Sequence, residues 1–324
     1  MMRAMRCHAF GPPENLILDQ APIPQPGPGQ VAIKVAAAGV NFADLLMTSG
    51  QYQEKPPLPF SPGFEAAGTV REVGEGVTGF ALGERVVAMT DWGAFAEQAV
   101  ARASDVFVLP AEMDFATAAA LSIAYGTAYG ALTWRAALKP GETLLVHGAT
   151  GGVGLAAVEV GRAMGATVIA TASGPDKLAL AEARGAHHVI DYRHEDVRTR
   201  VREICSGVDV AFDPVGGAAF EASLRVANWG ARIVIVGFAG GTVPQIPANI
   251  LLVKNASAIG FYFGSYRRRR PELLPGAFAQ LFAWYREGRI RPLVSEKLPL
   301  DRAAEALLRL RDRRATGKIV LELG

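Results

Sequence analysis

The turn "HGATGGVG" at 147–154 constrains the fold of this chain more than any other stretch. It follows a short apolar run and opens a segment in which Val153, Ala157, Val160 and Met164 recur at helical spacing. A strand, a glycine-rich turn and a helix in this order are typical of a dinucleotide-binding unit, where the helix N-terminus receives the phosphates. The turn alone is weak evidence, because any tight strand-to-helix connection can use glycine.

The segments around this turn strengthen the prediction. Short apolar runs alternate with helical patterns, and one of these helices is expected to stop at Gly185. Strands are predicted at 143–148, 167–172, 187–192, 208–213, 231–237 and 257–264. Strands that alternate with helices in this way indicate an α/β domain with a doubly wound parallel sheet.

The first hundred residues have a different character and indicate a β-rich domain. Strands are predicted at 30–40, 68–74 and 84–89, between stretches rich in Gly and Pro. After about residue 265 we expect two helical stretches and a last strand at 317–323 that returns to the first domain. A chain of 324 residues exceeds the usual size of a single core. We therefore predict one domain from 1–122 and 265–324, and a dinucleotide-binding domain from 123–264.

Composition indicates which partners and which compartment to expect. The net charge is +2, from 33 basic and 31 acidic residues, so neither a nucleic acid nor an acidic membrane is an expected partner. Two cysteines and an N-terminus without a secretory signal favour the cytoplasm. Residues 115–134 contain no charge and are long enough to span a bilayer, but their many small residues favour a buried helix at a domain junction.

The glycine turn and the next strand end together suggest which cofactor is bound. Gly151 lets the backbone approach a pyrophosphate, Gly154 lets the helix lie close to the strand, and Ala149 takes the place of the usual first glycine. About twenty residues later, where NAD-binding chains carry an acid, Ser173 stands without a charge, and Lys177 can reach a 2′-phosphate. We therefore predict NADPH rather than NADH.

Tyr192, at the end of the third strand, can add a hydroxyl or pack near the adenine. The alternatives are that Lys177 is a solvated residue in the first turn of a helix and that Tyr192 is a half-buried residue at a strand end.

Four segments carry a family resemblance: "GVNFADLLMTSGQY" (39–52), "PGFEAAG" (62–68), "GTAYGAL" (126–132) and "LLVKN" (251–255). With the layout above, they resemble the zinc-free quinone oxidoreductase branch, the zeta-crystallin type, of the medium-chain dehydrogenases/reductases. The resemblance covers essentially the whole chain. It implies a GroES-like catalytic domain, a Rossmann domain with a six-stranded sheet, and a homodimer.

The resemblance also places the positions where the zinc-dependent members carry metal ligands. Here these positions hold Asn41, Phe64 and Ile123, and the four-cysteine structural lobe is absent. Phe and Ile cannot bind zinc, so no metal is expected. His147, on the first strand of the Rossmann domain, is interpreted as a core histidine. Without a Lewis acid, the expected reaction is hydride transfer from NADPH to an acceptor that is already electrophilic, such as a quinone.

The resemblance implies roles for individual residues. Asn41 and Thr127 should lie near the nicotinamide and the substrate carbonyl, and Asn41 could donate a hydrogen bond to that oxygen. Tyr52 is the candidate proton donor or aromatic wall. The alternatives are a turn asparagine, a packing threonine and a loop tyrosine without a role, and Asp44 is expected to cap a helix. Further cofactor contacts are expected at Gly152, Val153, Gly237, Phe238 and Phe263, of which Gly237 and Phe238 end the fifth strand and Phe263 the sixth.

Two other functions stay open. One is reduction of α,β-unsaturated carbonyls, including enoyl thioesters. The other is a non-catalytic structural or RNA-binding role for a protein that holds a cofactor. The run "YRRRRP" at 266–271 is expected to be a solvated helix entry, and Arg314 and Lys318 to be surface charges.

Overall fold

The computed structural model describes residues 1–323, which divide into two compact units. Unit 1 comprises 1–123, 271–278 and 292–324, and unit 2 comprises 124–270 and 279–291. The division predicted from the sequence differs mainly over 279–291, which group with unit 2 in the structure.

Unit 1 is built on a seven-stranded sheet, ordered β14-β15-β3-β4-β5-β7 with β6 paired to β3, and a separate β1-β2 pair. Its strands are β1 Met2–Arg6, β2 Ile17–Ala21, β3 Gln30–Gly39, β4 Glu65–Val73, β5 Arg85–Met89, β6 Gln98–Arg102, β7 Val106–Val108, β14 Val294–Pro299 and β15 Lys318–Glu322. The predicted return of the last strand is confirmed, because β15 pairs antiparallel with β3. Strand β14 was not predicted.

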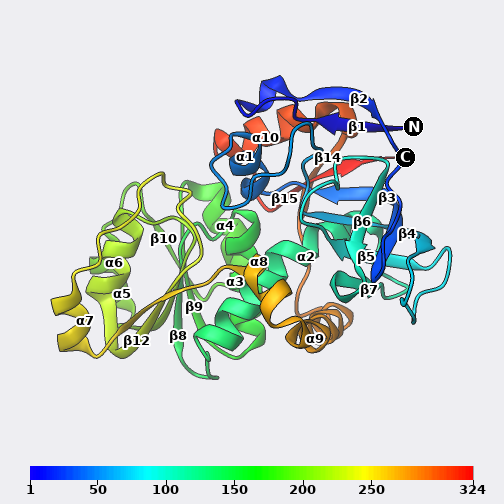
Figure 1. Ribbon diagram of the computed structural model, residues 1–324. Helices are drawn as coiled ribbons and strands as arrows, with labels where there is room; N and C mark the ends of the chain where they lie inside the picture. The colour runs from blue at the N-terminus through cyan, green and yellow to red at the C-terminus, as the bar shows by residue number, and fades with distance from the viewer. Residues whose placement is uncertain (324) are drawn as a thin grey trace. The chain divides into compact units, whose positions relative to one another are not determined.

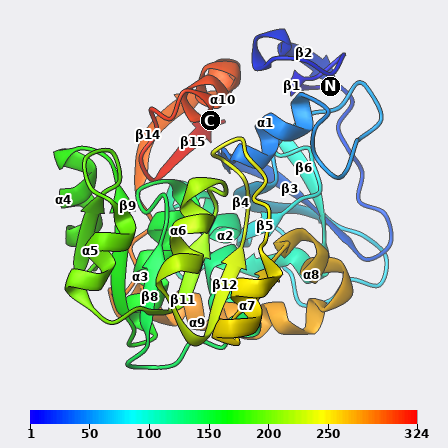
Figure 2. The same ribbon diagram turned by 90° about the vertical axis from the view of Figure 1, so that its left-hand side faces the viewer.

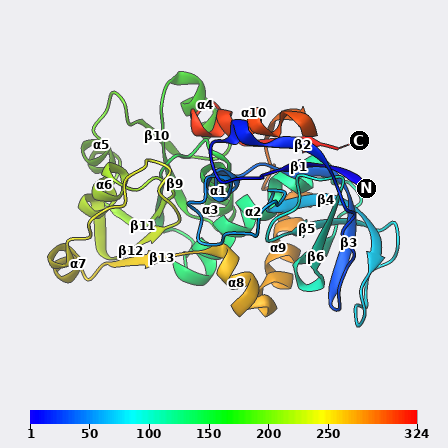
Figure 3. The same ribbon diagram turned by 45° about the horizontal axis from the view of Figure 1, so that its top comes forward.

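Within residues 1–323, unit 1 contains two whole α-helices and the first parts of two others. They are α1 Phe42–Thr48, the first part of α2 Phe115–Gly130, the first part of α9 Leu274–Arg286, and α10 Ala303–Arg311. Helices α1 and α10 share an apolar core. Leu307 of α10 and Met47 of α1 are fully buried in the same core as Phe95 and Leu321. Figure 3 shows α10 beside α1 and the β1-β2 pair.

Unit 2 has a parallel sheet of six strands in the order β10-β9-β8-β11-β12-β13, which confirms the predicted doubly wound sheet. Its strands are β8 Thr143–Val146, β9 Thr167–Ala172, β10 His188–Asp191, β11 Val208–Asp213, β12 Ala227–Ile235 and β13 Ser257–Gly260. Its helices are α3 Gly152–Ala163, α4 Pro175–Ala183, α5 Val197–Ile204, α6 Ala218–Val226, α7 Ala248–Lys254 and α8 Phe263–Arg269. Helices α3 and α4 cover one face of the sheet and α5 and α6 the other (Figures 1 and 2).

Helix α2 continues into a π-helical turn at Ala131–Arg135. The stretch Phe115–Arg135 is long and apolar enough to cross a membrane, but 78% of its most apolar window is buried inside the fold. The prediction of a buried helix is confirmed. Its small residues permit close packing: a Cβ on Gly126 would lie 2.6 Å from the Phe263 ring.

Candidate active site

Glu65 is the centre of a buried polar cluster in unit 1. It is the first residue of β4 and is completely buried. Its Oε1 accepts hydrogen bonds from Asn41 Nδ2 and Lys318 Nζ, each at 2.8 Å. Its Oε2 accepts from Ser122 Oγ at 2.6 Å and from the Ile123 backbone N–H at 2.7 Å. The junction between β3 and α1, the strands β4 and β15, and helix α2 therefore meet at one carboxylate.

Asn41, which follows β3 and precedes α1, has its side chain held at both ends. Lys318 Nζ donates to its Oδ1 at 2.6 Å, and its Nδ2 donates to Glu65 and, at 3.3 Å, to the Gly39 carbonyl oxygen. An ammonium can only donate and a carboxylate can only accept, so the amide has one orientation. The proposed hydrogen bond from Asn41 to a substrate would therefore have to replace the longer bond to Gly39.

Asp44 caps the start of α1, as predicted. Its Oδ2 accepts from the Asn41 backbone N–H at 2.8 Å and its Oδ1 from that of Gly63 at 2.9 Å. The side chain is completely buried, and this desolvation raises the pKa of its carboxyl to about 7 against the opposing effect of the two hydrogen bonds and Lys318. Asp44 thus fixes the backbone on which Asn41 stands.

Tyr52 and Phe64 form an aromatic contact beside this cluster. Their ring centroids lie 5.2 Å apart at an interplanar angle of 59°. Tyr52 is half-buried and packs on the apolar core of unit 1, as Ile123 does. Both roles of Tyr52, aromatic wall and proton donor, stay predictions.

The positions predicted to correspond to zinc ligands converge here. Asn41 and Ile123 bond to Glu65, and Phe64 is its chain neighbour. Neither Phe nor Ile has a donor atom for zinc, and residues 1–323 contain no group of three or more His, Cys, Asp or Glu side chains that could hold a metal ion. The donor set does not fit the catalytic zinc of the zinc-dependent relatives.

The glycine turn of unit 2 has the geometry of a phosphate cradle. Gly148 has a φ of 57°, and a Cβ on Gly154 would lie 2.1 Å from the Gly148 carbonyl oxygen, so only glycine lets α3 start this close to β8. A Cβ on Gly151 would meet nothing closer than 3.5 Å, which leaves open space in front of the turn. Gly152 and Val153 begin α3, where backbone N–H groups lack partners within the helix. Ala149 is buried behind them, and its N–H donates to Thr171.

The adenosine end of the predicted site contains an acid that sequence reasoning missed. Ser173 follows β9, Lys177 lies in the first turn of α4, and Tyr192, 46% exposed, follows β10. Between them Asp191 Oδ2 accepts from the Gly174 N–H at 3.3 Å and faces His194 Nδ1 at 2.9 Å. The hydrogen bond with His194 is the main cause of a lowered pKa for the Asp191 carboxyl. Its place at a strand end was visible in the sequence, but its approach to the neighbouring strand was not.

The remaining predicted cofactor residues lie near strand ends, with one correction. Strand β12 ends at Ile235, and Gly237 and Phe238 follow it closely. Phe263 does not end the sixth strand: β13 stops at Gly260, and Phe263 is the first residue of α8, buried against Gly126 of α2. Thr127, next to Gly126, is also buried in unit 2.

Lys318 and the arginine run at 267–270 differ from their predictions. Lys318 is 4% exposed and is no surface charge. The arginine run ends helix α8 rather than entering a helix, and Arg267 is buried, so the run is not wholly solvated. His147 is a core histidine, as predicted: Nδ1 lies 3.1 Å from Thr171 Oγ1 and Nε2 2.8 Å from Ser223 Oγ.

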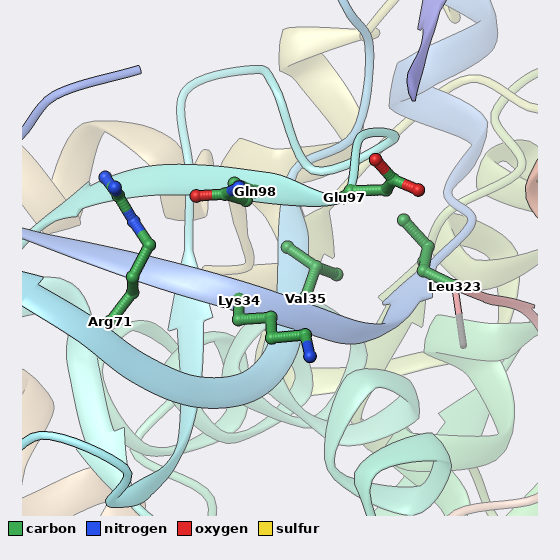
Figure 4. Close-up of a pocket in the computed structure, with 6 residues that line it drawn as sticks. All are labelled: Lys34, Val35, Arg71, Glu97, Gln98 and Leu323. Carbon is green, nitrogen blue, oxygen red and sulfur yellow. The ribbon is translucent and has the colours of Figure 1, made fainter. Parts of the chain in front are cut away.

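A pocket of about 380 Å³ lies on the sheet of unit 1, away from all these residues (Figure 4). It is lined by Lys34, Val35, Arg71, Glu97, Gln98 and Leu323. It includes none of the candidate site residues.

Comparison with known proteins identifies the family. Residues 27–111 match the family model of the alcohol dehydrogenase GroES-like domain, and 152–279 match that of the zinc-binding dehydrogenases. A quinone oxidoreductase-like protein 2 homolog from Nematostella vectensis is 40% identical over 98% of this chain and 88% of its own. The chain belongs to the quinone oxidoreductases of the medium-chain dehydrogenase/reductase family.

Solved structures of quinone oxidoreductase relatives agree with this assignment. A mycobacterial protein complexed with NADPH is 34% identical, with a TM-score of 0.93 over 99% of this chain and 100% of that chain. Escherichia coli quinone oxidoreductase, also complexed with NADPH, is 33% identical, with a TM-score of 0.91 over 99% of both chains. The predicted GroES-like and Rossmann architecture is confirmed.

Proposed function

We propose that this oxidoreductase transfers hydride from NADPH to a quinone without a metal ion. The observation that carries the proposal is the cluster around Glu65, where Asn41, Phe64 and Ile123 converge, the three positions expected to correspond to zinc ligands. Without a Lewis acid, an unactivated alcohol or aldehyde is a poor substrate. A quinone accepts hydride directly, and the names of the relatives agree with this acceptor.

In this proposal the residues of the chain bind and orient. The nicotinamide supplies the hydride when NADPH is bound. The turn at Gly151 and the first N–H groups of α3 would receive the pyrophosphate, Lys177 would supply a charge for the 2′-phosphate, and Tyr192 would add a hydroxyl or pack near the adenine. Asn41 donates a hydrogen bond to the acceptor oxygen as negative charge develops there. Tyr52 of unit 1 is assigned to the acceptor, and Thr127, Phe238 and Phe263 of unit 2 are assigned to the nicotinamide end of the cofactor.

The experiment that tests this function is an NADPH-oxidation screen over quinones and enones, with NADH in parallel and zinc determined in the same preparation. We expect turnover with quinones, a preference for NADPH, and no stoichiometric zinc. Activity that requires zinc would overturn the metal-free mechanism. Equal rates with NADH would overturn the role of Lys177, and Asp191 beside Gly174 gives a physical reason to include this comparison.

Reduction of enones is the second candidate, because a conjugated carbonyl also needs no metal to accept hydride. Higher kcat/KM for enones than for quinones in the same screen would favour it. A cofactor-holding protein without turnover would show NADPH binding but no oxidation with either class, and RNA binding at physiological salt would then be the next measurement.

We also propose that the protein is a homodimer in the cytoplasm, joined through the edge of the unit 2 sheet. Strand β13 is an edge strand of this sheet. Helix α7 precedes it in the chain, and its side chains Leu252 and Val253 are 77% and 78% exposed. Trp229 on β12 is 77% exposed. Such exposed apolar side chains beside an open edge favour pairing with a second copy. Sedimentation should show a dimer, and Leu252→Glu should shift it to monomer; a monomeric wild type would overturn this.

A further inference from the structure

Lys318 places a buried positive charge at the centre of the candidate site in unit 1. It is the first residue of β15, and its Nζ donates to Val40 O at 2.8 Å, Asn41 Oδ1 at 2.6 Å and Glu65 Oε1 at 2.8 Å. An ammonium has three N–H donors, so all of them are used. Lys318 has none left for a substrate and can act on one only through its neighbours.

The neighbour through which it can act is Asn41. Lys318 occupies the amide oxygen of Asn41 and Glu65 accepts from its nitrogen, which excludes the flipped amide. A cation on Oδ1 also polarises the amide and strengthens its N–H groups as donors. The one weak bond of this side chain, 3.3 Å to the Gly39 carbonyl, leaves an N–H that an acceptor oxygen can take over.

The cluster leaves little room for another arrangement. A Cβ on Gly39 would lie 2.3 Å from Glu65 Oε1 and 2.2 Å from the Ala119 carbonyl oxygen, so the end of β3 reaches this position only because it is glycine. The side chains of Lys318 and Glu65 are 5% and 0% exposed. Their charges therefore compensate each other rather than being screened by water.

We propose that Lys318 is a positioning residue for the electron-acceptor site. With Glu65 it fixes the Asn41 carboxamide, and it supplies a positive charge beside the positions that are expected to correspond to zinc ligands. This inference rests on the proposed function, which assigns Asn41 to the acceptor oxygen. It adds the reason why this side chain can work as a donor.

The first test compares Lys318→Met with Lys297→Met. Lys297 is the matched control because it forms a Lys–Glu pair with Glu322 across the adjacent strands β14 and β15, with both side chains 51% exposed. For Lys318→Met we expect kcat with a quinone to fall about 10-fold or more, less than the roughly 100-fold that loss of an oxyanion donor itself can cause. KM for NADPH should stay unchanged, and Lys297→Met should keep the wild-type kcat. A wild-type kcat in Lys318→Met would overturn the proposal.

Two further variants separate positioning from folding. Lys318→Met/Glu65→Gln removes both charges, so it should recover stability lost in Lys318→Met while kcat stays low. In an Asn41→Ala background, Lys318→Met should cause no further loss of kcat, because it acts through Asn41. Recovery of kcat in the double neutral variant, or independent multiplying losses in the cycle, would contradict positioning.

A readout without turnover keeps this inference distinct from the proposed function. In the wild type the Asn41 side-chain amide protons should exchange slowly with solvent in NMR, and in Lys318→Met they should exchange faster. If the wild type oxidises no NADPH, the proposed function fails, while the exchange measurement still decides whether Lys318 fixes Asn41. Unchanged exchange in Lys318→Met would overturn the inference whatever the activity.

Discussion

Each unit of the molecule contains a buried glutamate that joins distant segments, but the two differ in what balances their charge. In unit 1, Glu65 pairs with Lys318, whose side chain is 5% exposed. In unit 2, Glu159 of α3 accepts from Tyr125 Oη at 2.7 Å, the Arg291 N–H at 2.8 Å and Arg184 Nη1 at 3.1 Å. The Arg184 side chain is 19% exposed, so its charge keeps some access to water.

This difference separates a site from a structural link. Glu159 ties Tyr125 of α2, Arg184 after α4 and Arg291 after α9 into one unit, and burial raises the pKa of its carboxyl. None of these partners is a candidate site residue. Glu65 instead has as its partners Asn41 and the backbone of Ile123, at the positions expected to correspond to metal ligands. The same residue type therefore links helices in one unit and holds Asn41 of the proposed site in the other.

The largest effect should come from Glu65→Gln. Without the carboxylate, the buried Lys318 ammonium loses the counter-charge to which it is hydrogen-bonded, and breaking such a pair costs about 3–5 kcal/mol in the free energy of unfolding. Urea unfolding measures the loss. Glu322→Gln, on the same strand as Lys318 but in an exposed pair, is the control and should cost less than about 1 kcal/mol. A similar small cost for Glu65→Gln would show that Lys318 does not depend on a buried counter-charge.

Glu159→Gln should have the next largest effect. The amide keeps the shape of the side chain and can still accept from Tyr125 or Arg291, while Arg184 can turn toward water. We expect a loss of about 1–3 kcal/mol, the usual range for leaving buried hydrogen-bonding groups incompletely paired. The quinone turnover of the folded variant should equal that of the wild type. If turnover fell as in Lys318→Met, Glu159 would be more than a structural link.

Two buried titratable groups, one in each unit, should make the free energy of unfolding depend on pH in opposite directions. Burial lowers the pKa of His147 in unit 2, so its stabilising contribution is present above its ordinary value of 6.5 and is lost as the pH falls through the lowered pKa. Burial raises the pKa of Asp44 in unit 1 from 3.8 to about 7, so its contribution is present below pH 3.8 and is lost as the pH rises through about 7.

Each group changes the slope of the unfolding free energy by at most about 1.4 kcal/mol per pH unit. Unfolding curves between pH 4 and 8 measure this slope for the wild type, His147→Gln and Asp44→Asn. His147→Gln should flatten the acid side, and Asp44→Asn should flatten the loss between pH 4 and 7. Slopes that neither variant changes would show that other groups control the pH dependence.

Local patterns were enough to predict most of the fold. Strands β9 and β11 have the predicted bounds, Asp44 caps the start of α1, and Gly185 follows the end of α4, as expected. Errors arose where local sequence is ambiguous. The apolar run 257–264 predicts one strand, but the chain turns into α8 after Gly260. Strand β14, "VSEKLP", lacks a strong apolar pattern and depends on pairing with β15.

The site could be predicted only in part, because its central interaction is not local. Asn41, Phe64 and Ile123 follow from the family pattern, and the structure brings them together at Glu65. Lys318 stands 253 residues from Glu65 in a charged, C-terminal stretch that is typical of a surface. Its burial follows only from the return of β15 to β3, and nothing near it in the sequence indicates its partner.

The smallest effect should come from Tyr125→Phe, which removes one hydroxyl from the Glu159 link. Tyr125 is 2% exposed, and burial, with Glu159 next, raises the pKa of its phenol well above the usual value, so it is a neutral donor. Phe keeps the ring packing, and Glu159 Oε2 keeps the Arg291 N–H. We therefore expect a loss of about 1 kcal/mol in urea unfolding. A loss equal to that of Glu159→Gln would mean that the Tyr125 hydrogen bond, and not the partly solvated Arg184 pair, provides most of the stability of the Glu159 link. Glu159 would then depend on a neutral donor, whereas Glu65 depends on the charge of Lys318.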